Sequence, residues 1–435
     1  MKFENNYDDS INNMQNEHGG NLFKEFNKND YDIFNFFNEA KKKIDFSANI
    51  NPLGLSKNAL CILKNTKLLK FLIENYPEVY PERLTNKLCD HHNVHNANIT
   101  IGAGATNLIY KILSVFKPEN VLIAEPSFAE YKRACSVLKI NTVHQSTCFE
   151  EEFKLINNNL TEFIDKIKNL RKNDFIFIAS PSNPAGVITS ISTIQEILKL
   201  CRNKNIYLIL DESFMDFKEE YSSKHLIEEF DNLIILRSMT KFFAIPGERL
   251  GYILSCKKNI LKIINTAVPW GISGLASALS ISSLSDKKYI KDTVQYVNKL
   301  KEEMYNELLK FKIFKIIYGE ANFLLIKIKT ENNSNSYQSC NYYNYNQNNY
   351  NYDVHNTCHS DNIVNKINSE TYQNISDSAL NLKNYLLNSD ILIRYAGNYN
   401  CLDDSFFRIA IKKRGENKIL IDKLKKYVYI NPTSP

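Results

Sequence analysis

Lys241 lies in the segment SMTKFFAIPGERLGY, which continues the apolar run NLIILRS, a pattern typical of a buried strand. Ser238 and Thr240 stand beside the lysine, and Arg249 follows eight residues later. Hydroxyl groups and a guanidinium bind a dianion such as phosphate, while an amine forms an imine with an aldehyde. The segment therefore predicts a site for a phosphate-bearing cofactor that reacts with Lys241. A surface lysine after a strand is the simpler alternative, so support must come from other segments.

Three further side chains follow strand-like runs upstream of this lysine. Asp211, in IYLILDES, could pair with a protonated pyridine nitrogen, or it could simply cap a helix. Asn183, in SPSNPAG, could donate a hydrogen bond to a phenolic oxygen, or it could belong to an ordinary Asn-Pro turn. Phe128, in EPSFAEY, could stack on an aromatic ring or be a core residue. Each indication is modest by itself, and their common position at strand ends gives them weight.

The segment GAGAT, which contains Ala105 and Thr106, precedes the helical run NLIYKILSVF. Glycines at the start of a helix expose backbone N–H groups that bind anions. Many helices begin with glycine, so this motif alone is weak. Together with Lys241 and Arg249 it predicts a second part of a phosphate site.

Strand-like and helical runs alternate between about residues 84 and 251, which predicts an α/β domain. The helical run at 191–204 separates two of the strands. Unbroken apolar strands indicate a mostly parallel sheet covered by helices on both faces, with function at the carboxyl ends of the strands. The predicted strands are 120–126, 174–181, 206–213, 232–238 and 250–255.

The rest of the chain predicts a smaller α+β domain. A long helix is expected at 286–309 and a strand at 321–329, whereas 331–378 is rich in Asn and Tyr and reads as a flexible insertion. The expected organisation is an N-terminal arm with part of the small domain (1–75), a large cofactor-binding domain (76–285) and a small C-terminal domain (286–435).

Composition excludes several classes of function. The 435 residues carry 54 Lys plus Arg against 48 Asp plus Glu, and this modest excess of +6 argues against a dedicated nucleic-acid binder. No apolar run reaches the roughly 18 residues that span a bilayer, and the first twenty residues lack the apolar region of a signal peptide. The nine cysteines form no C-x-x-C pair, which predicts reduced thiols in the cytoplasm. His355, Cys358 and His359 lie in the low-complexity stretch, so we expect no metal site there.

In order and spacing, the segments from about 18 to 427 resemble the fold-type-I pyridoxal-phosphate enzymes, in the branch that holds histidinol-phosphate aminotransferase. The resemblance implies that Lys241 binds the cofactor covalently, that Asp211 pairs with the pyridinium, and that Asn183 and Phe128 contact the ring. It implies a phosphate site made of Ala105, Thr106, Ser238, Thr240 and Arg249. It also implies a homodimer, in which Tyr76 of NYPE reaches the other subunit's cofactor phosphate.

Two N-terminal stretches, HGGNLF and DFSANINPLG, are similar to a narrower family, the L-threonine-O-3-phosphate decarboxylases of cobalamin biosynthesis. RSMTKFFAIPGERLGY and DESFMDF are also closer to that family, and Phe214 stands where many aminotransferases have a tyrosine. This resemblance implies decarboxylation of L-threonine O-3-phosphate to (R)-1-aminopropan-2-yl phosphate. The implied ligands of this small phosphorylated amino acid are His18, Gly19, Asn51, Arg394 and Arg408, with Arg408 holding the carboxylate. For Arg394 a surface arginine is an equal alternative.

Other functions remain open from the sequence. A histidinol-phosphate aminotransferase would share the fold, the cofactor and most site residues. A regulatory protein that binds the cofactor without catalysis is less consistent with the presence of Lys241 and Arg408, and the chain has no room for an added DNA-binding domain. The Asn- and Tyr-rich stretch could be an interaction module, although biased coding composition explains it equally.

Overall fold

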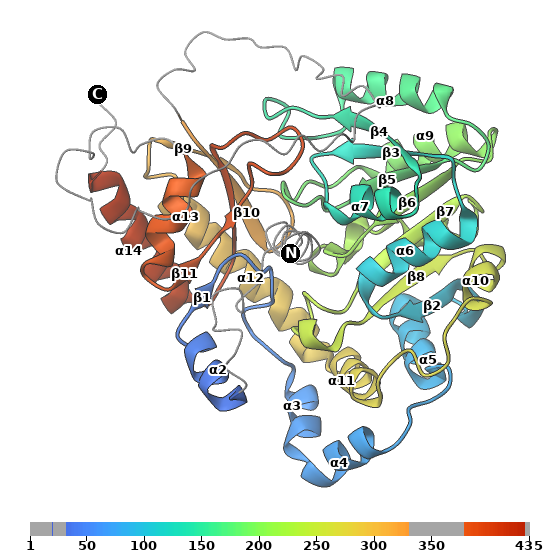
Figure 1. Ribbon diagram of the computed structural model, residues 1–435, viewed down its shortest axis with the longest axis horizontal. Helices are drawn as coiled ribbons and strands as arrows, with labels where there is room; N and C mark the ends of the chain where they lie inside the picture. The colour runs from blue at the N-terminus through green and yellow to red at the C-terminus, as the bar shows by residue number, and fades with distance from the viewer. Residues whose placement is uncertain (1–19, 21–31, 330–377, 431–435) are drawn as a thin grey trace, which may run out of the picture.

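The computed structural model describes residue 20, residues 32–329 and residues 378–430. Its largest feature is a seven-stranded sheet in the order β2-β8-β7-β6-β5-β3-β4 (Figure 1). Strands β3 to β7 pair in parallel, whereas β8 runs antiparallel to both neighbours, so the sheet is mixed and mostly parallel, as predicted. The strands are β2 (Ile99–Gly102), β3 (Asn120–Glu125), β4 (Asn141–Ser146), β5 (Phe175–Ala179), β6 (Tyr207–Asp211), β7 (Leu233–Ser238) and β8 (Gly251–Ser255).

All five predicted strands are present, with ends displaced by two residues or fewer. The sequence missed β2 and β4. Strand β2 has only four residues, and β4 lies at an edge with exposed polar side chains, so neither produces a long apolar run.

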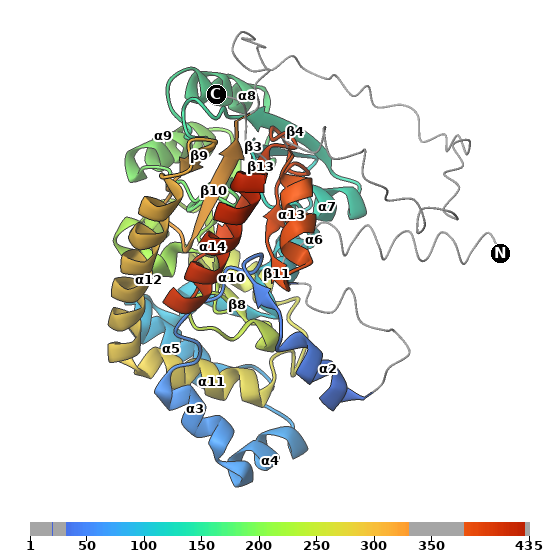
Figure 2. The ribbon, with the colours of Figure 1, turned by 90° about the vertical axis from the view of Figure 1, so that its left-hand side faces the viewer.

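Helices cover both faces of this sheet because neighbouring residues of each strand point to opposite sides (Figures 1 and 2). Leu208 and Leu210 pack on one side of β6, and Ile209 packs on the other. Burial of each such side chain stabilises the fold by about 1.5–3 kcal/mol. One face carries α5 (Glu82–His92), α8 (Asn157–Asn169), α9 (Ile191–Arg202) and α11 (Gly274–Ser285). The other carries α6 (Gly104–Phe116), α7 (Glu130–Val137) and α10 (Lys257–Ile264).

A second layer is built on the long helix α12 (Lys287–Leu308). This helix begins after Asp286, and the Asp286 carboxylate accepts a hydrogen bond from the Tyr289 N–H. Its antiparallel sheet has the order β12-β13-β10-β9. The elements are β9 (Phe314–Ile317), β10 (Phe323–Ile328), α13 (Ala379–Leu387), β12 (Arg394–Tyr395), β13 (Phe406–Ala410) and α14 (Arg414–Ile430). The N-terminal strand β1 (Ile44–Asp45) pairs in parallel with β11 (Ile391–Leu392), which brings the start of the described chain into this layer. The remaining N-terminal helices are α2 (Ile33–Ala40), α3 (Lys57–Lys64) and α4 (Thr66–Glu74).

Successive side chains of β13 point to opposite faces of the small sheet, and this alternation decides which of them face the large sheet. Phe407 and Ile409 enter the core formed with α12, α13 and α14. Phe406 packs on the opposite face, in a cluster with Ala185 from the loop after β5. Arg408 lies between Phe407 and Ile409, so it faces the same side as Phe406 and is delivered to the seam between the two sheets.

Several sequence calls fall outside the described residues, namely His18, Gly19, His355, Cys358, His359 and residues 331–377 of the insertion. Within 32–329 and 378–430, no helix is long and apolar enough to cross a membrane. None of the seven cysteines that the structure describes forms a disulfide.

The two ends of the segment 330–377 are held by adjacent residues. The Ile328 N–H donates to the Ser405 carbonyl at 3.0 Å, and the Ala379 N–H donates to the Asp404 carbonyl at 2.7 Å. We therefore predict that deletion of 332–377 leaves the fold intact, with a change in unfolding free energy of roughly 1–2 kcal/mol, because loop closure depends only weakly on length. Urea unfolding of the deletion variant and the full chain measures this. A variant that does not fold would show that the segment contributes to the core.

Candidate active site

Lys241 lies in the turn that follows β7, where its carbonyl accepts a hydrogen bond from the Asn51 N–H at 3.0 Å. Its Nζ donates to Ser238 Oγ at 3.2 Å and lies 5.6 Å from the centre of the Phe214 ring. Burial lowers the pKa of this amine to about 8. The Asp211 carboxylate opposes that shift, while Arg249 and Arg408 add to it. The neutral amine needed for attack on an aldehyde is therefore far more populated here than in a free lysine.

Hydroxyl groups and a helix N-terminus meet beside Lys241. Ser238 Oγ and Thr240 Oγ1 are 2.8 Å apart at the end of β7. Helix α6 begins at Gly104, which has a φ of +86°, and a Cβ at this position would lie 3.2 Å from an Arg249 guanidinium nitrogen. The first N–H groups of α6 include that of Ala105, and such groups have no partner within a helix.

The approach of α6 to β8 also depends on a glycine. A Cβ on Gly251 would lie only 2.6 Å from the Ala105 backbone nitrogen. The predicted phosphate residues Ala105, Thr106, Ser238, Thr240 and Arg249 are thus brought to one place, at the start of α6 and around the ends of β7 and β8.

Asp211 ends β6 and is almost fully buried. One carboxylate oxygen accepts from the Ser213 N–H at 2.9 Å, and the other accepts from the Tyr131 hydroxyl at 2.5 Å. Tyr131 is itself buried, stacks on Phe177 at 4.7 Å, and meets the Phe128 ring edge-on at 5.8 Å. Burial, followed by the Asp211 charge, raises the pKa of Tyr131 well above its usual value, so it remains a donor. The sequence analysis missed Tyr131, and its only signal is its place three residues after Phe128.

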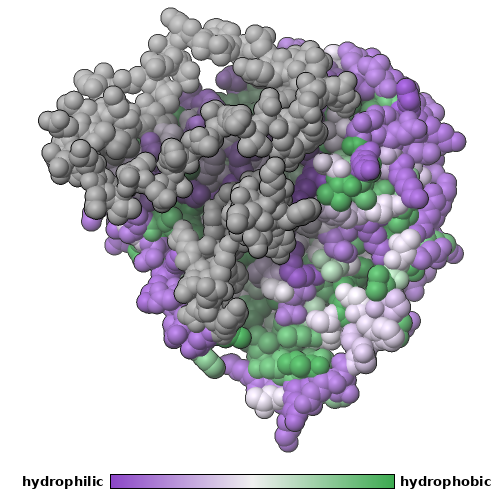
Figure 3. All heavy atoms as spheres, viewed as in Figure 1, coloured by the Kyte–Doolittle hydropathy of each residue, from purple (hydrophilic) through white to green (hydrophobic). Residues whose placement is uncertain are grey.

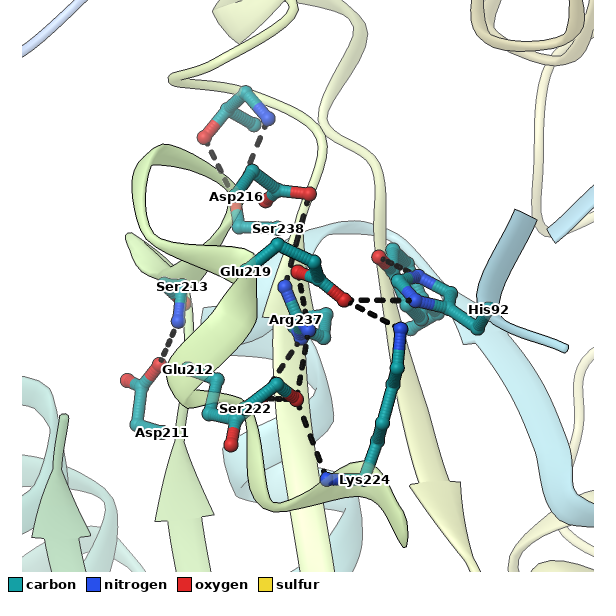
Figure 4. A network of polar contacts seen from close by, with 12 residues as sticks. His92, Asp211, Glu212, Ser213, Asp216, Glu219, Ser222, Lys224, Arg237 and Ser238 are labelled. Carbon is teal, nitrogen blue, oxygen red and sulfur yellow. Dashed lines mark hydrogen bonds and ion pairs between the residues drawn. The ribbon is translucent and has the colours of Figure 1, made fainter. Parts of the chain in front are cut away.

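A buried charge cluster holds Asp211 and Ser238 in place (Figure 4). Arg237 precedes Ser238 in β7, is fully buried, and forms ion pairs with Glu212 at 3.0 Å and Glu219 at 2.8 Å. Glu212 follows Asp211 and also accepts from the Ser222 hydroxyl at 2.7 Å. The ends of β6 and β7 are therefore joined by the residues next to the two site side chains. The sequence analysis overlooked this cluster because its charges are separate in the sequence.

Two arginines lie opposite each other in the small sheet. Arg408 of β13 and Arg394 of β12 are register partners, with 4 % and 6 % of their surface exposed. Arg394 is therefore not a surface arginine. Its guanidinium lies 4.9 Å from the centre of the Tyr399 ring, and it donates to the Tyr395 carbonyl at 2.5 Å.

Arg408 reaches across the seam to the large sheet. It donates to the Asn183 side-chain oxygen and, at 2.7 Å, to the Ser47 carbonyl, whereas its buried Nε has no hydrogen-bond partner. Burial lowers its pKa to about 10, with the Tyr399 side chain opposing and Arg394 reinforcing the shift. The side chain remains charged at neutral pH, and an unpaired buried donor beside Asn183 is suited to an incoming anion.

The remaining predicted residues make fewer contacts with Lys241 and the two arginines. The Asn51 amide nitrogen lies 2.7 Å from the Phe242 carbonyl and 2.8 Å from the Tyr289 hydroxyl, so it supports the turn that carries Lys241. Tyr76 is 85 % exposed and contacts the Trp270 ring at 5.3 Å. The N–H of Gly20, next to the undescribed His18 and Gly19, donates to the Ser47 hydroxyl at 2.7 Å.

This chain is similar to known proteins in both sequence and fold. A family model described as aminotransferase class I and II matches residues 41–424. The threonine-phosphate decarboxylase of Salmonella typhimurium is 28% identical over 387 residues, which cover 88% of this chain and 90% of that protein.

Two solved structures share the fold. The histidinol-phosphate aminotransferase from Clostridium acetobutylicum has a TM-score of 0.70 at 28% identity, covering 89% of this chain and 99% of that chain. The L-threonine-O-3-phosphate decarboxylase from Porphyromonas gingivalis has a TM-score of 0.68 at 21% identity, covering 88% and 99%. The fold predicted from the sequence, that of the fold-type-I pyridoxal-phosphate enzymes, is confirmed.

The Arg237 cluster makes stability depend on pH through Asp216. This carboxyl lies 3.7 Å from Arg237, and burial, with Glu219 and Glu212 nearby, raises its pKa to about 7. Between the ordinary carboxyl pKa of 3.8 and about 7, the folded protein keeps a proton that the unfolded chain has released, so the unfolding free energy falls across this pH range and levels off above it. Asparagine has no ionisable carboxyl. In Asp216→Asn we therefore expect the fall in unfolding free energy to be about 1–3 kcal/mol smaller than in the wild type.

Thermal and urea unfolding at about pH 5 and about pH 8.5 measure this difference. Asp292→Asn, which removes a solvent-exposed carboxylate paired with Lys288, is the matched control and should retain the wild-type slope. Equal slopes for Asp216→Asn and the wild type would contradict the assignment.

Proposed function

The chain belongs to the class I and II aminotransferase family, and we propose that it decarboxylates L-threonine O-3-phosphate to (R)-1-aminopropan-2-yl phosphate. The observation that carries this proposal is the pair of buried arginines at the seam. Arg394 and Arg408 lie opposite each other in β12 and β13, next to the strand ends that carry Lys241. Two adjacent buried cations are suited to a substrate with two anionic groups, and this substrate carries both a carboxylate and a phosphate.

The described residues fit pyridoxal phosphate, the cofactor of this family. Lys241 supplies a buried amine of lowered pKa, and Gly104 keeps open the space beside Arg249 that a Cβ would narrow. When bound, this cofactor supplies an electron sink for a bond at the substrate Cα. In the proposal Lys241 binds it covalently, Asp211 pairs with its ring nitrogen, and Asn183 and Phe128 contact its ring. Its phosphate is held by Ala105, Thr106, Ser238, Thr240 and Arg249, with Tyr76 of a partner subunit.

The two arginines would decide which bond at Cα breaks, because they would fix how the substrate is held at both ends. Arg408 would bind the carboxylate through its unpaired Nε and hold it in a fixed orientation. Arg394 binds the phosphate at the other end of the substrate, and this remote binding energy fixes the torsion about Cα. Lys241, with a pKa of about 8, then delivers the proton that replaces carbon dioxide at Cα.

The Asp211 carboxylate would pair with the ring nitrogen, and the Tyr131 hydroxyl donates a hydrogen bond that holds this carboxylate in position. Phe214 places a ring without a hydroxyl beside Lys241, where it excludes water and donates no hydrogen bond. Candidate ligands for the substrate phosphate beyond Arg394 are His18 and the N–H of Gly19. Asn51 acts beneath the lysine turn, so we propose a positioning contribution for it.

Amino transfer from histidinol phosphate is the second candidate, favoured by the 28% identity to the Clostridium acetobutylicum enzyme. It would use the same cofactor residues. Histidinol phosphate carries a phosphate but no carboxylate, so it would leave one of the two seam arginines without an anionic partner. In the second half of such a reaction, a keto acid with two carboxylates would offer an anion to both arginines.

Incubation of the purified protein with L-threonine O-3-phosphate should release carbon dioxide and aminopropanol phosphate, with threonine a poor substrate. Arg394→Ala should lose about 1.5–3 kcal/mol of charged hydrogen bonding, which is roughly a 10- to 100-fold fall in kcat/KM, with cofactor binding unchanged. Lys241→Ala should lose both turnover and the cofactor link that borohydride fixes.

Arg171→Ala is the matched control, because Arg171 is largely exposed and pairs only with surface Glu119 in the described structure. Rapid amino transfer from histidinol phosphate to 2-oxoglutarate, without carbon dioxide from threonine phosphate, would refute the proposed reaction in favour of the alternative.

A second copy of the chain is part of the proposal. Apolar residues that are half or more exposed lie on α4 and on the loops that precede α5 and α11, and Figure 3 shows apolar surface at the lower end of the molecule. The Trp270 N–H donates to the Val79 carbonyl at 3.1 Å, so the two loops that carry this surface are joined. The apolar surface patch consists of Phe71, Ile73, Tyr76, Val79, Val268 and Trp270. A homodimer that buries it would bring Tyr76 to the neighbouring site.

Mixing two inactive variants tests this arrangement. Tyr76→Ala and Lys241→Ala are each expected to lose most activity, but a mixed dimer has one site with Lys241 from one chain and Tyr76 from the other. Equal mixing with subunit exchange should therefore restore about a quarter of wild-type activity, because half of the dimers have one complete site of two. If Tyr76 acts within its own chain, mixing restores nothing.

A further inference from the structure

Residues 399–401, in the loop between β12 and β13, contact three strand ends of the large sheet in succession. The Tyr399 hydroxyl donates to the Asn183 side-chain oxygen at 3.3 Å, after β5. The Asn400 amide donates to Glu125 at 2.9 Å, at the end of β3. Cys401 Sγ lies 3.1 Å from Ser146 Oγ, at the end of β4. This loop therefore spans the seam directly beside the candidate site.

Tyr399 touches both halves of that site. Its ring lies 4.9 Å from the Arg394 guanidinium and packs against the apolar cluster that contains Phe406 and Leu402. A guanidinium over an aromatic face is held there by the ring quadrupole, which fixes the plane of the Arg394 head group. The ring of Tyr399 is thus the surface on which the proposed phosphate ligand rests.

The hydroxyl of Tyr399 contacts the other half of the site, which contains Asn183. The Asn183 side-chain oxygen accepts from both Tyr399 and Arg408, and both of these groups donate. An amide whose oxygen is occupied in this way has a fixed orientation, because exchange of its oxygen and nitrogen would place donor against donor. The Asn183 amide nitrogen is left to donate in the opposite direction. Phe214 has no hydroxyl group that could donate a hydrogen bond at this place. The orientation of the Asn183 amide donor therefore matters more.

We propose that Tyr399 is a positioning residue that links recognition of the substrate phosphate to the cofactor ring, its ring setting Arg394 and its hydroxyl orienting Asn183. This inference rests on the proposed function, because it takes Arg394 as the phosphate ligand and Asn183 as the ring ligand. It adds a residue that the sequence motifs did not single out, on a loop of the small sheet.

Two substitutions separate the parts of this contribution. Tyr399→Phe keeps the ring and removes the hydroxyl, so KM for L-threonine O-3-phosphate should stay within about twofold. The pH midpoint of the cofactor absorbance should rise, because a less ordered Asn183 donates more weakly to the ring oxygen. Tyr399→Leu removes the ring as well, and KM for the phosphorylated substrate should rise by about 3- to 30-fold.

Two controls exclude a general effect on the loop. Tyr395→Phe removes a neighbouring phenol that donates to Asp404, and Asn400→Ala removes only the loop contact with Glu125. Both should keep the wild-type absorbance midpoint. The inference is overturned if Tyr399→Phe leaves the midpoint unchanged, or if Tyr399→Leu changes KM no more than Asn400→Ala does.

The absorbance titration contains no substrate, so it separates this inference from the proposed reaction. A shifted midpoint in a protein that does not decarboxylate threonine phosphate would refute the reaction and support the link to Asn183. An unshifted midpoint in a protein that does decarboxylate threonine phosphate would support the reaction and refute the link to Asn183. If Tyr399→Leu does not fold, Tyr399→Met, which removes the ring and keeps an apolar side chain, tests the ring contact through the same KM.

Discussion

The buried guanidinium of Arg237 is the interaction on which the site depends most. A fully buried charge without partners would destabilise the fold strongly, so Arg237 fixes where Glu212 and Glu219 must stand. Glu212 and Arg237 are each one residue from a site side chain, Asp211 and Ser238 respectively. The same pairing that neutralises the charge therefore fixes the spacing between the carboxylate and the hydroxyl of the cofactor site. An apolar replacement of similar volume could stabilise the core and still lose that spacing.

The second constraint is the two-residue period of β13. Because Phe407 and Ile409 must enter the core of the small sheet, Arg408 must face the large one. Register with β12 then places Arg394 beside it. Substrate recognition is thus a consequence of how the small sheet packs, and a one-residue slip of β13 would bury Arg408 in the wrong core.

Strands such as β6 and β7 could be predicted because their apolar runs are long and uninterrupted, and the side chains at their ends follow from the topology of parallel sheets. The grouping of Lys241 with Ser238, Thr240 and Arg249 was predictable for the same reason. Tyr131 and Tyr399 could not be found in this way, since their hydrogen bonds to Asp211 and Asn183 join residues more than fifty positions apart. Arg394 shows the limit most clearly, because its burial depends on the pairing of two short strands that lack a strong pattern.

The contact between Ser47 and Arg408 joins residues 361 positions apart, and that separation governs when the site can form during synthesis. The strands that carry Lys241 and Asp211 leave the ribosome long before β13 exists, so the large sheet can fold around an incomplete pocket. The N-terminal stretch through Ser47 must meanwhile wait for almost the whole chain before its partner appears. Contacts of such length slow folding. Each nascent chain therefore passes through a period in which the pocket for the reactive amine is built but the arginines that select the substrate are still missing.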